Sequence, residues 1–206
     1  MAVFFDYENV HRTGHSQYSQ YGTPVHETVF DPSELAERIC AKRNRPSELV
    51  SVRVYRGRPV PQHQPVPASA FDMQVNAWTK DPRVAIISRA LKYDFPYDDP
   101  TQFLAQEKGI DVSLAIDLVE AAMKGSYDAM VVFSSDTDLL PALELVRKIH
   151  NVHIEIACWS EGNPLWLREG LSQDPPVHFP YCHFMKGEDF LGARDTTAYN
   201  MTLSNP

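Results

Sequence analysis

The chain has 206 residues, of which 27 are acidic and 19 are basic, so its formal net charge is −8. A hydrophobic content of 43% supplies enough core material to exclude disorder over the whole length. No apolar run approaches the ~20 residues of a membrane helix, and three widely spaced cysteines exclude a disulfide framework or a zinc pattern. The N-terminus lacks the basic region of a signal peptide. We expect a cytoplasmic protein with one domain over residues 1–190 and a polar, flexible tail over 191–206.

The first quarter of the chain predicts two strands separated by a loop and a helix. Residues 3–5 form an apolar run that ends at Asp6, which is typical of a buried strand. Residues 11–30 are rich in His, Ser, Gln, Tyr and Gly without a regular period, so we expect a long loop. Residues 31–42 open with Asp, Pro and, three positions after the Asp, Glu, which is a helix-start signal. Residues 49–55 are rich in β-branched side chains and predict a second strand.

The middle of the chain predicts a helix and a strand between two loops. Residues 57–67 contain several prolines, so regular structure is not expected there. Residues 71–79 carry apolar side chains at helical spacing and predict a helix. Residues 83–91 predict a third strand, and the acids and prolines of 94–100 predict a loop.

The last part of the chain continues the alternation of helices and strands. Residues 111–124 predict a helix, and the continuous apolar run 129–133 is typical of a strand that is covered on both faces. The remaining predicted elements are a helix over 138–150, a strand over 152–157, a short helix over 164–171 and a strand near 178–184. This alternation predicts an α/β fold: a doubly wound, mainly parallel sheet of five or six strands with helices on both faces.

Carboxylates stand where two of the predicted strands end. Asp6 follows the first strand, and Asp136 and Asp138 follow the strand at 129–133. If these strands are adjacent, the acids converge at the carboxyl edge of the sheet, where doubly wound folds bind ligands. Asp111, at the start of the helix before that strand, is a fourth candidate. Clustered carboxylates repel one another, and a divalent cation relieves the repulsion; hard oxygen ligands select Mg²⁺ or Mn²⁺. Such an ion can activate a water and stabilise charge on a phosphodiester.

Each of these acids also has an ordinary interpretation. An Asp after a strand is often a helix cap or a turn former, and Asp111 alone fits capping at the positive end of the helix dipole. Asp117 lies about 240° round the helix from Asp111, so we expect it at a solvent or packing edge outside the site. The coincidence of acids at the ends of two separate strands is what favours a site.

Three segments contain the candidate aspartates: Phe5 to Val10 (FDYENV), Lys108 to Val112 (KGIDV) and Ser134 to Leu139 (SSDTDL). In sequence and in order, these segments resemble the NYN family of PIN-like nucleases. The resemblance implies a PIN-like fold and a metal-dependent ribonuclease, with endonucleolytic cleavage favoured. It implies that the acids that bind Mg²⁺ or Mn²⁺ and act in catalysis are Asp6, Asp111, Asp136 and Asp138. The candidates for substrate binding are Asn9, Ser135, Thr137, Arg56 and Arg58.

Basic residues are concentrated between Arg38 and Arg58, where seven of them and one acid give a charge of 7 − 1 = +6. This segment can neutralise an RNA backbone, or it can be a solvated helix face and a strand-end turn. The better candidates for RNA contacts are Arg56 and Arg58, because they follow the end of a strand. The expected partner is RNA, single-stranded or structured, without a membrane; a homodimer is left open. Loop residues that either touch substrate or only pack locally are His11, His15, His26, Tyr7, Tyr18 and Tyr21.

Other functional classes compete with the nuclease hypothesis. A non-catalytic RNA-binding or scaffold module on the same fold predicts no cleavage with Mn²⁺. An aspartyl-phosphate phosphatase needs a second Asp where this chain has Glu8, and a dinucleotide oxidoreductase needs a Gly-x-Gly-x-x-Gly after the first strand, which is missing. A nucleoside-sugar transferase would rest on the Asp136-Thr137-Asp138 triplet alone, which is too short to support it.

Overall fold

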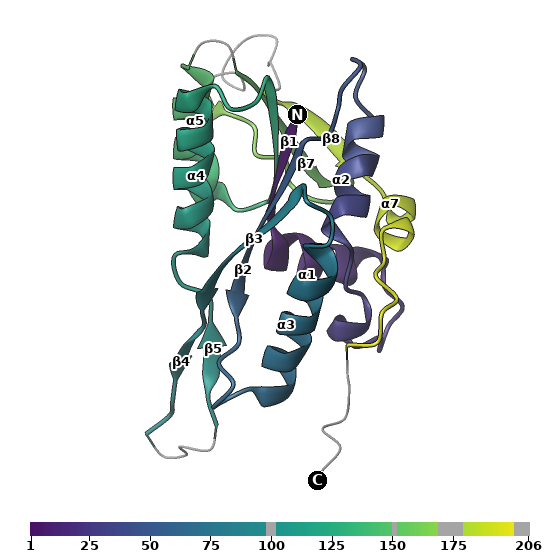
Figure 1. Cartoon of the computed structure of the whole chain (residues 1–206), viewed down its shortest axis with the longest axis vertical. Helices are drawn as coiled ribbons and strands as arrows, with labels where there is room; N and C mark the ends of the chain where they lie inside the picture. Colours follow the sequence, from purple (N-terminus) through teal and green to yellow (C-terminus); the bar gives the residue numbers. More distant parts are fainter. Residues whose placement is uncertain (98–101, 150–151, 169–178, 200–206) are drawn as a thin grey trace.

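A parallel sheet of six strands, ordered β3-β2-β1-β6-β7-β8, forms the centre of the molecule (Figure 1). The computed structural model describes residues 1–97, 102–149, 152–168 and 179–199. Every neighbouring pair in this sheet is parallel. The strands are β1 (Ala2–Asp6), β2 (Ser51–Arg58), β3 (Val84–Ala90), β6 (Ala129–Phe133), β7 (His153–Trp159) and β8 (Tyr181–Met185). The predicted α/β fold with a mainly parallel sheet is confirmed.

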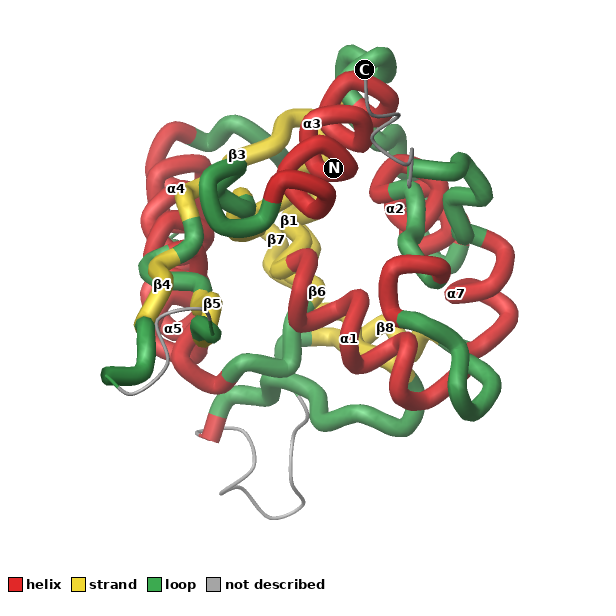
Figure 2. Tube along the Cα trace, turned by 90° about the horizontal axis from the view of Figure 1, so that it is seen from below, coloured by secondary structure: helices red, strands yellow, loops and turns green. Residues whose placement is uncertain are grey.

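Helices cover both faces of the sheet (Figures 1 and 2). One face carries α1 (Tyr7–Tyr18), α2 (Pro32–Ala41), α3 (Pro65–Trp78) and α7 (Gly187–Gly192). The other face carries α4 (Ile110–Lys124) and α5 (Leu140–Arg147). The smaller elements are the 3₁₀ turns η1 (Val25–Glu27) and η2 (Thr137–Leu139) and the antiparallel hairpin of β4 (Lys92–Asp94) and β5 (Leu104–Gln106). In Figure 1 the hairpin extends below the main sheet.

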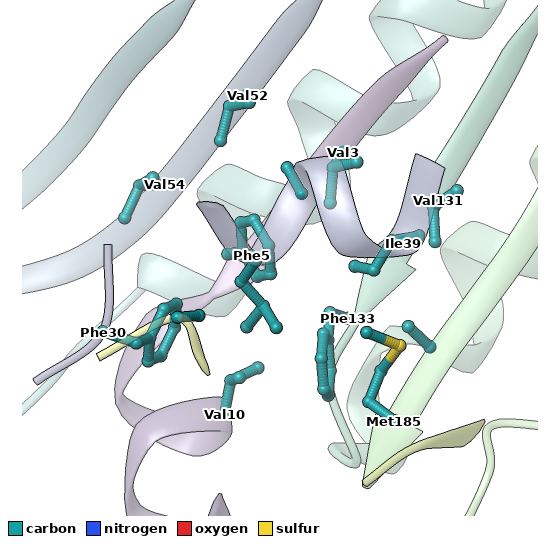
Figure 3. Close-up of a cluster of buried hydrophobic side chains, with 14 of the residues drawn as sticks. Val3, Phe5, Val10, Phe30, Ile39, Val52, Val54, Val131, Phe133 and Met185 are labelled. Atoms are coloured by element: carbon teal, nitrogen blue, oxygen red, sulfur yellow. The ribbon is translucent and has the colours of Figure 1, made fainter. Parts of the chain in front are cut away.

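Two hydrophobic cores lie between the sheet and the helices, one on each face of the sheet. Successive side chains of a strand point to opposite faces, so Val3 and Phe5 enter the core beneath α1 and α2, whereas Ala2 and Phe4 enter the core beneath α4 and α5. Figure 3 shows the first of these cores, in which Phe5 lies among side chains from several elements. Burial on both faces explains why β1 and β6 are continuous apolar runs rather than alternating ones.

The predicted start of the helix near residue 31 is confirmed. The Asp31 side chain accepts hydrogen bonds from the backbone N–H groups of Ser33 and Glu34, and Pro32 opens α2. A cap of this kind contributes about 1 kcal/mol, because it satisfies N–H groups that lack partners within the helix.

The predicted loop over 11–30 is wrong in its first part, because α1 continues to Tyr18. Its buried positions follow helical spacing, but His11 and Gly14 occupy two of them, so an apolar period is not visible in the sequence. Gly14 is required by close packing: a Cβ atom there would lie 2.8 Å from the Phe190 ring and 2.9 Å from Trp159.

Two other predicted boundaries shift in the structure. The helix expected from residue 71 begins at Pro65, because Pro65 and Pro67 lie in its first turn, where a missing N–H costs little. The loop expected over 94–100 begins one residue later, because Asp94 is the last residue of β4, which pairs with β5. Residues 98–101 lie outside the described residues. In the predicted helix 164–171, residues 164–167 are not helical, and 169–171 lie outside the described residues.

The packed chain also extends beyond the boundary predicted at residue 190. Ala193 and Tyr199 are buried, and the Asp195 carboxylate accepts hydrogen bonds from the Trp78 indole N–H (2.9 Å) and from the Tyr199 hydroxyl. Ala193, Asp195 and Tyr199 therefore pack against the fold beyond the expected boundary; residues 200–206 lie outside the described residues. Among the described residues, no helix has the length and apolar character needed to cross a bilayer.

Candidate active site

The strand order changes direction at β1, which pairs with β2 on one side and with β6 on the other. In the register of β1 and β6, Phe5 lies beside Phe133, so Asp6 and Ser134 leave the sheet side by side. A switch point of this kind leaves a crevice at the carboxyl ends of the two strands. The expectation that the two acid-bearing strands are adjacent is therefore confirmed.

Three of the four predicted aspartates form a compact cluster at this edge. Asp111, Asp136 and Asp138 each present a carboxylate oxygen, and these three oxygens lie within 4.8 Å of one another. Asp111 is in the first turn of α4, and the other two belong to the segment that follows β6. Within the described residues, none of the three forms an ion pair with a basic side chain. Hard oxygen ligands at this spacing, without a neutralising partner, fit a divalent cation such as Mg²⁺ or Mn²⁺.

Asp6 lies in the same 440 Å³ pocket as Asp111 and Asp136, but it is not a member of the three-oxygen cluster. Its Oδ2 accepts a 2.8 Å hydrogen bond from the Ser134 hydroxyl. Burial raises the pKa of Asp6 to about 6, and the negative charges of Asp136 and Asp111 act in the same direction, against the hydrogen bond from Ser134. Asp6 is thus the buried acid of the pocket, and its charged form is disfavoured until a cation is nearby.

A network of hydrogen bonds shapes the segment after β6. Asn9 Oδ1 accepts from the backbone N–H of Ser135 at 3.0 Å and from its hydroxyl at 2.9 Å. The Asp136 N–H donates to Ser134 Oγ (3.0 Å), and the Asp138 N–H donates to Asp136 Oδ1 (3.0 Å). Asn9 and Ser135, predicted to bind substrate, therefore hold this segment in place, and Asp136 both caps η2 and faces the pocket. Thr137 is exposed beside them.

Arg56 and Arg58, also predicted to bind substrate, are both engaged with acids of the protein. The Arg56 side chain is largely buried and pairs with Glu8 at 3.2 Å, and its guanidinium lies over the ring of Tyr7. Arg58 pairs with Asp72 at 2.9 Å on the surface.

The basic segment as a whole is mostly neutralised within the fold. Besides Arg56 and Arg58, the basic residues with acidic partners are Lys42, Arg43 and Arg53. The segment is therefore neither a free phosphate-binding surface nor a simple solvated face. Asp117 is the partner of Arg53 and lies at the packing edge of α4, outside the pocket, as expected.

The sequence reasoning missed two residues that line the acidic pocket, Glu107 and Lys108. Glu107 accepts a short hydrogen bond from the backbone N–H of Gly57, and a Cβ at position 57 would lie 2.8 Å from Glu107 Cγ, so glycine allows this approach. Although part of Glu107 faces solvent, burial of its carboxyl group raises the pKa to about 7. Lys108 has no ion-pair partner within the described residues. Both residues lie just before Asp111 in the sequence, and Lys108 belongs to the KGIDV segment. The sequence analysis selected only Asp111 from this segment as a site residue.

Three of the histidines and tyrosines near β1, namely His11, Tyr7 and Tyr18, have contacts within the fold. His11 is buried, its Nε2 lies 3.2 Å from the Thr28 hydroxyl, and burial lowers its pKa to about 4. Tyr7 is buried in the core, and the Tyr18 hydroxyl lies 3.0 Å from Ser160 Oγ. Tyr21 is fully exposed. Aromatic stacking on RNA by Tyr7 is therefore excluded by its burial.

Comparison with known proteins identifies a family. The family model described as the NYN domain matches residues 1–164, which includes all four aspartates. No curated protein matches the chain. Among solved structures, a protein of unknown function from Vibrio parahaemolyticus is similar with a TM-score of 0.47 and 15% identity, over 77% of this chain and 80% of that chain. At this level of similarity no residue role passes from one chain to the other.

Proposed function

Because the chain belongs to the NYN domain family, which has a nuclease-type fold, we propose that it is a metal-dependent ribonuclease that cleaves RNA internally. The observation that carries this proposal is the cluster of Asp111, Asp136 and Asp138, whose carboxylate oxygens lie within 4.8 Å of one another at the switch point of the sheet. Helix capping accounts for one oxygen of Asp136, but it does not account for three carboxylates so close together without a basic partner among the described residues.

The residues of the pocket have different roles in this proposal. Asp111, Asp136 and Asp138 would hold the cation, and Asp6 would supply a further carboxylate from the buried side of the pocket. When bound, Mg²⁺ or Mn²⁺ supplies activation of a water and stabilisation of charge on the phosphodiester. Lys108 lies in the same pocket, has no ion-pair partner in the part of the chain that the structure describes, and would hold a phosphate oxygen of the RNA. Asn9 and Ser134 keep the acid-bearing segments in register.

The experiment that tests this proposal compares two variants of the same strand. Asp136 follows β6 and lies in the pocket, whereas Asp128 is exposed just before β6, at its opposite end. Purified wild type, Asp136→Asn and Asp128→Asn are incubated with single-stranded and structured RNAs in Mn²⁺, Mg²⁺ or EDTA. We expect metal-dependent cleavage by wild type and Asp128→Asn, and a rate at least about 100-fold lower for Asp136→Asn, because one ligand of the cation is lost.

Two outcomes would contradict the proposal. Equal cleavage by wild type and Asp136→Asn would mean that a contaminant cleaves the RNA. RNA binding without any cleavage in Mn²⁺ would favour a non-catalytic RNA-binding module on the same fold.

A further inference from the structure

A second cavity, with a volume of about 1070 Å³, adjoins the acidic pocket. Asn9 and Glu107 line both cavities, so the two lie next to each other. We call the second cavity the side chamber; its walls come from α1, the segment around η1, the end of β2, α3 and the β4–β5 hairpin. Its size is at the upper end of the range of about 300–1,000 Å³ for small-molecule sites. A polymer bound at the aspartates can therefore extend one of its groups into the side chamber.

The lining of the side chamber combines apolar side chains, uncharged polar side chains and charged groups of both signs. Val66, Ala70 and Phe71 of α3 contribute apolar surface. Arg56 and Arg12 share the Glu8 carboxylate, at 3.2 Å and 3.1 Å, and Glu107 is a second acid of the lining, so two basic residues face two acidic ones. A chamber with compensated charges and apolar walls does not favour a phosphate group, which needs a net positive surrounding. It favours a flat, neutral group.

Gln74 provides a hydrogen-bond donor to this chamber. Its Oε1 accepts a 2.7 Å hydrogen bond from Arg56 Nη1, and an arginine has only donors, so the orientation of the amide follows from the chemistry. The NH₂ group of Gln74 then faces away from Arg56, and within the described residues it has no acceptor. Gln74 is 5% exposed and lines the side chamber. Because this NH₂ group lies at the wall of the chamber without a protein acceptor, a ligand with an acceptor at this place gains a hydrogen bond.

We propose that the side chamber binds one unpaired nucleobase of the RNA that occupies the acidic pocket, with the Gln74 NH₂ group donating to an acceptor on the edge of the base. This inference rests on the proposed function and specifies its substrate class. A nucleobase combines flat, uncharged faces with acceptors on its edge. A base within a duplex is stacked and paired, so it does not enter. The enzyme therefore requires an unpaired nucleotide next to the bond that is cleaved.

Two variants of α3 test the chamber, with a third as control. Ala70→Trp fills the cavity, and Gln74→Glu keeps an acceptor for Arg56 but replaces the NH₂ donor with an oxygen. Asn76→Trp introduces the same indole side chain at an exposed position of α3 outside the lining. Binding of a fluorescently labelled, unpaired RNA oligonucleotide is measured in EDTA, where cleavage is blocked. We expect roughly tenfold weaker binding for the two chamber variants, the loss typical of one base contact, and a change within about twofold for Asn76→Trp.

A cleavage experiment locates the base. A series of RNAs, each with one abasic position, is cleaved by wild type and by Ala70→Trp in Mn²⁺. We expect one abasic position beside the cleaved bond to slow the wild type about tenfold and to have no further effect on Ala70→Trp, because the chamber is already closed. Melting temperatures verify that each variant is folded, and Gln74→Glu keeps the test decisive if Ala70→Trp does not fold.

The two proposals fail in different ways. If the chamber variants and Asn76→Trp bind unpaired RNA equally and cleave it equally, the base-binding proposal is overturned while metal-dependent cleavage can still hold. If no metal-dependent cleavage occurs but the chamber variants lose RNA binding, the chamber stands as an RNA site and the nuclease proposal falls. If a fully paired RNA binds and is cleaved as well as an unpaired one, the substrate class is wrong.

Discussion

Asp6 and Glu155 are buried to a similar extent, 8% and 5% exposed, yet their pKa values are displaced in opposite directions. Asp6 has a hydroxyl donor and two acidic neighbours, and burial raises its pKa to about 6. Burial of Glu155 also acts to raise its pKa, but hydrogen bonds from His183 and Arg43 outweigh it, and the pKa falls to about 2.

The difference lies in the partners and not in the depth of burial. Glu155 Oε1 lies 2.8 Å from Arg43 Nη2, and Oε2 lies 2.7 Å from His183 Nε2, so its charge is satisfied within the fold. Asp6 faces a pocket in which its neighbours carry the same charge. A satisfied carboxylate stabilises the structure, whereas carboxylates that repel one another at a switch point need an external cation and so indicate a site.

Removing the satisfied acid has the largest expected effect on stability. Glu155→Gln leaves Arg43 buried without its counter-charge, so we expect the free energy of unfolding to fall by about 3–5 kcal/mol. Asp138→Asn removes repulsion from the acid cluster, and we expect it to cost less than about 0.5 kcal/mol. Urea denaturation of both variants measures the contrast. Equal losses would show that the two acids have the same structural role.

Binding of a cation to the acid cluster should stabilise the protein. At a Mn²⁺ concentration 100 times its dissociation constant, we expect about 2.7 kcal/mol of added stability and a rise in melting temperature of roughly 5–10 °C. Asp136→Asn should lose this rise because it lacks a ligand of the cluster. Thermal denaturation with Mn²⁺ or EDTA measures it. A full rise in Asp136→Asn would place the cation elsewhere.

In the absence of a cation, we expect Asp6 and Glu155 to make the stability of the protein depend on pH in opposite directions. The pKa of Asp6 is raised in the folded protein from 3.8 to about 6, so its ionisation lowers stability as pH rises through this window. The pKa of Glu155 is lowered from 4.5 to about 2, so its contribution is complete above pH 4.5 and is lost as pH falls to 2. Each effect is at most about 3–3.5 kcal/mol, from about 1.4 kcal/mol per pKa unit.

Denaturation curves from pH 2 to 7 in EDTA separate these contributions. Asp6→Asn should remove the loss of stability between pH 4 and 6 and leave the loss below pH 4.5 unchanged. The interpretation of Asp6 is wrong if the variant and the wild type have the same profile over the upper window.

A small loss of stability is also expected at Asn9, which holds the acid-bearing segment through two hydrogen bonds to Ser135. Asn9→Ala should reduce stability by only about 1 kcal/mol but weaken Mn²⁺ affinity by about tenfold, as loss of a supporting hydrogen bond does at metal sites. Asn9→Asp keeps the acceptor oxygen and should retain most of the affinity. A titration with Mn²⁺ distinguishes these results, since loss of stability alone would leave the affinity unchanged.

Local patterns in the sequence determined the α/β class, most strand positions, the cap at Asp31 and the four aspartates that face one edge of the sheet. These features depend on residues close together in the chain: a continuous apolar run marks a buried strand, and a polar side chain directly after it marks the strand's end. The same segments carried the resemblance to the NYN family, and the family match confirmed it.

Only the tertiary structure decided which of these residues meet. It extended α1 through His11 and Gly14, paired the basic segment with acids elsewhere in the chain, separated Asp6 from the three-oxygen cluster and brought Glu107 and Gln74 to one cavity. The partners involved lie far apart in the sequence, such as Arg43 and Glu155, and no local period encodes such a contact. Their meeting depends on how the sheet and its helices pack, and that packing sets which charges are satisfied and which remain available for chemistry.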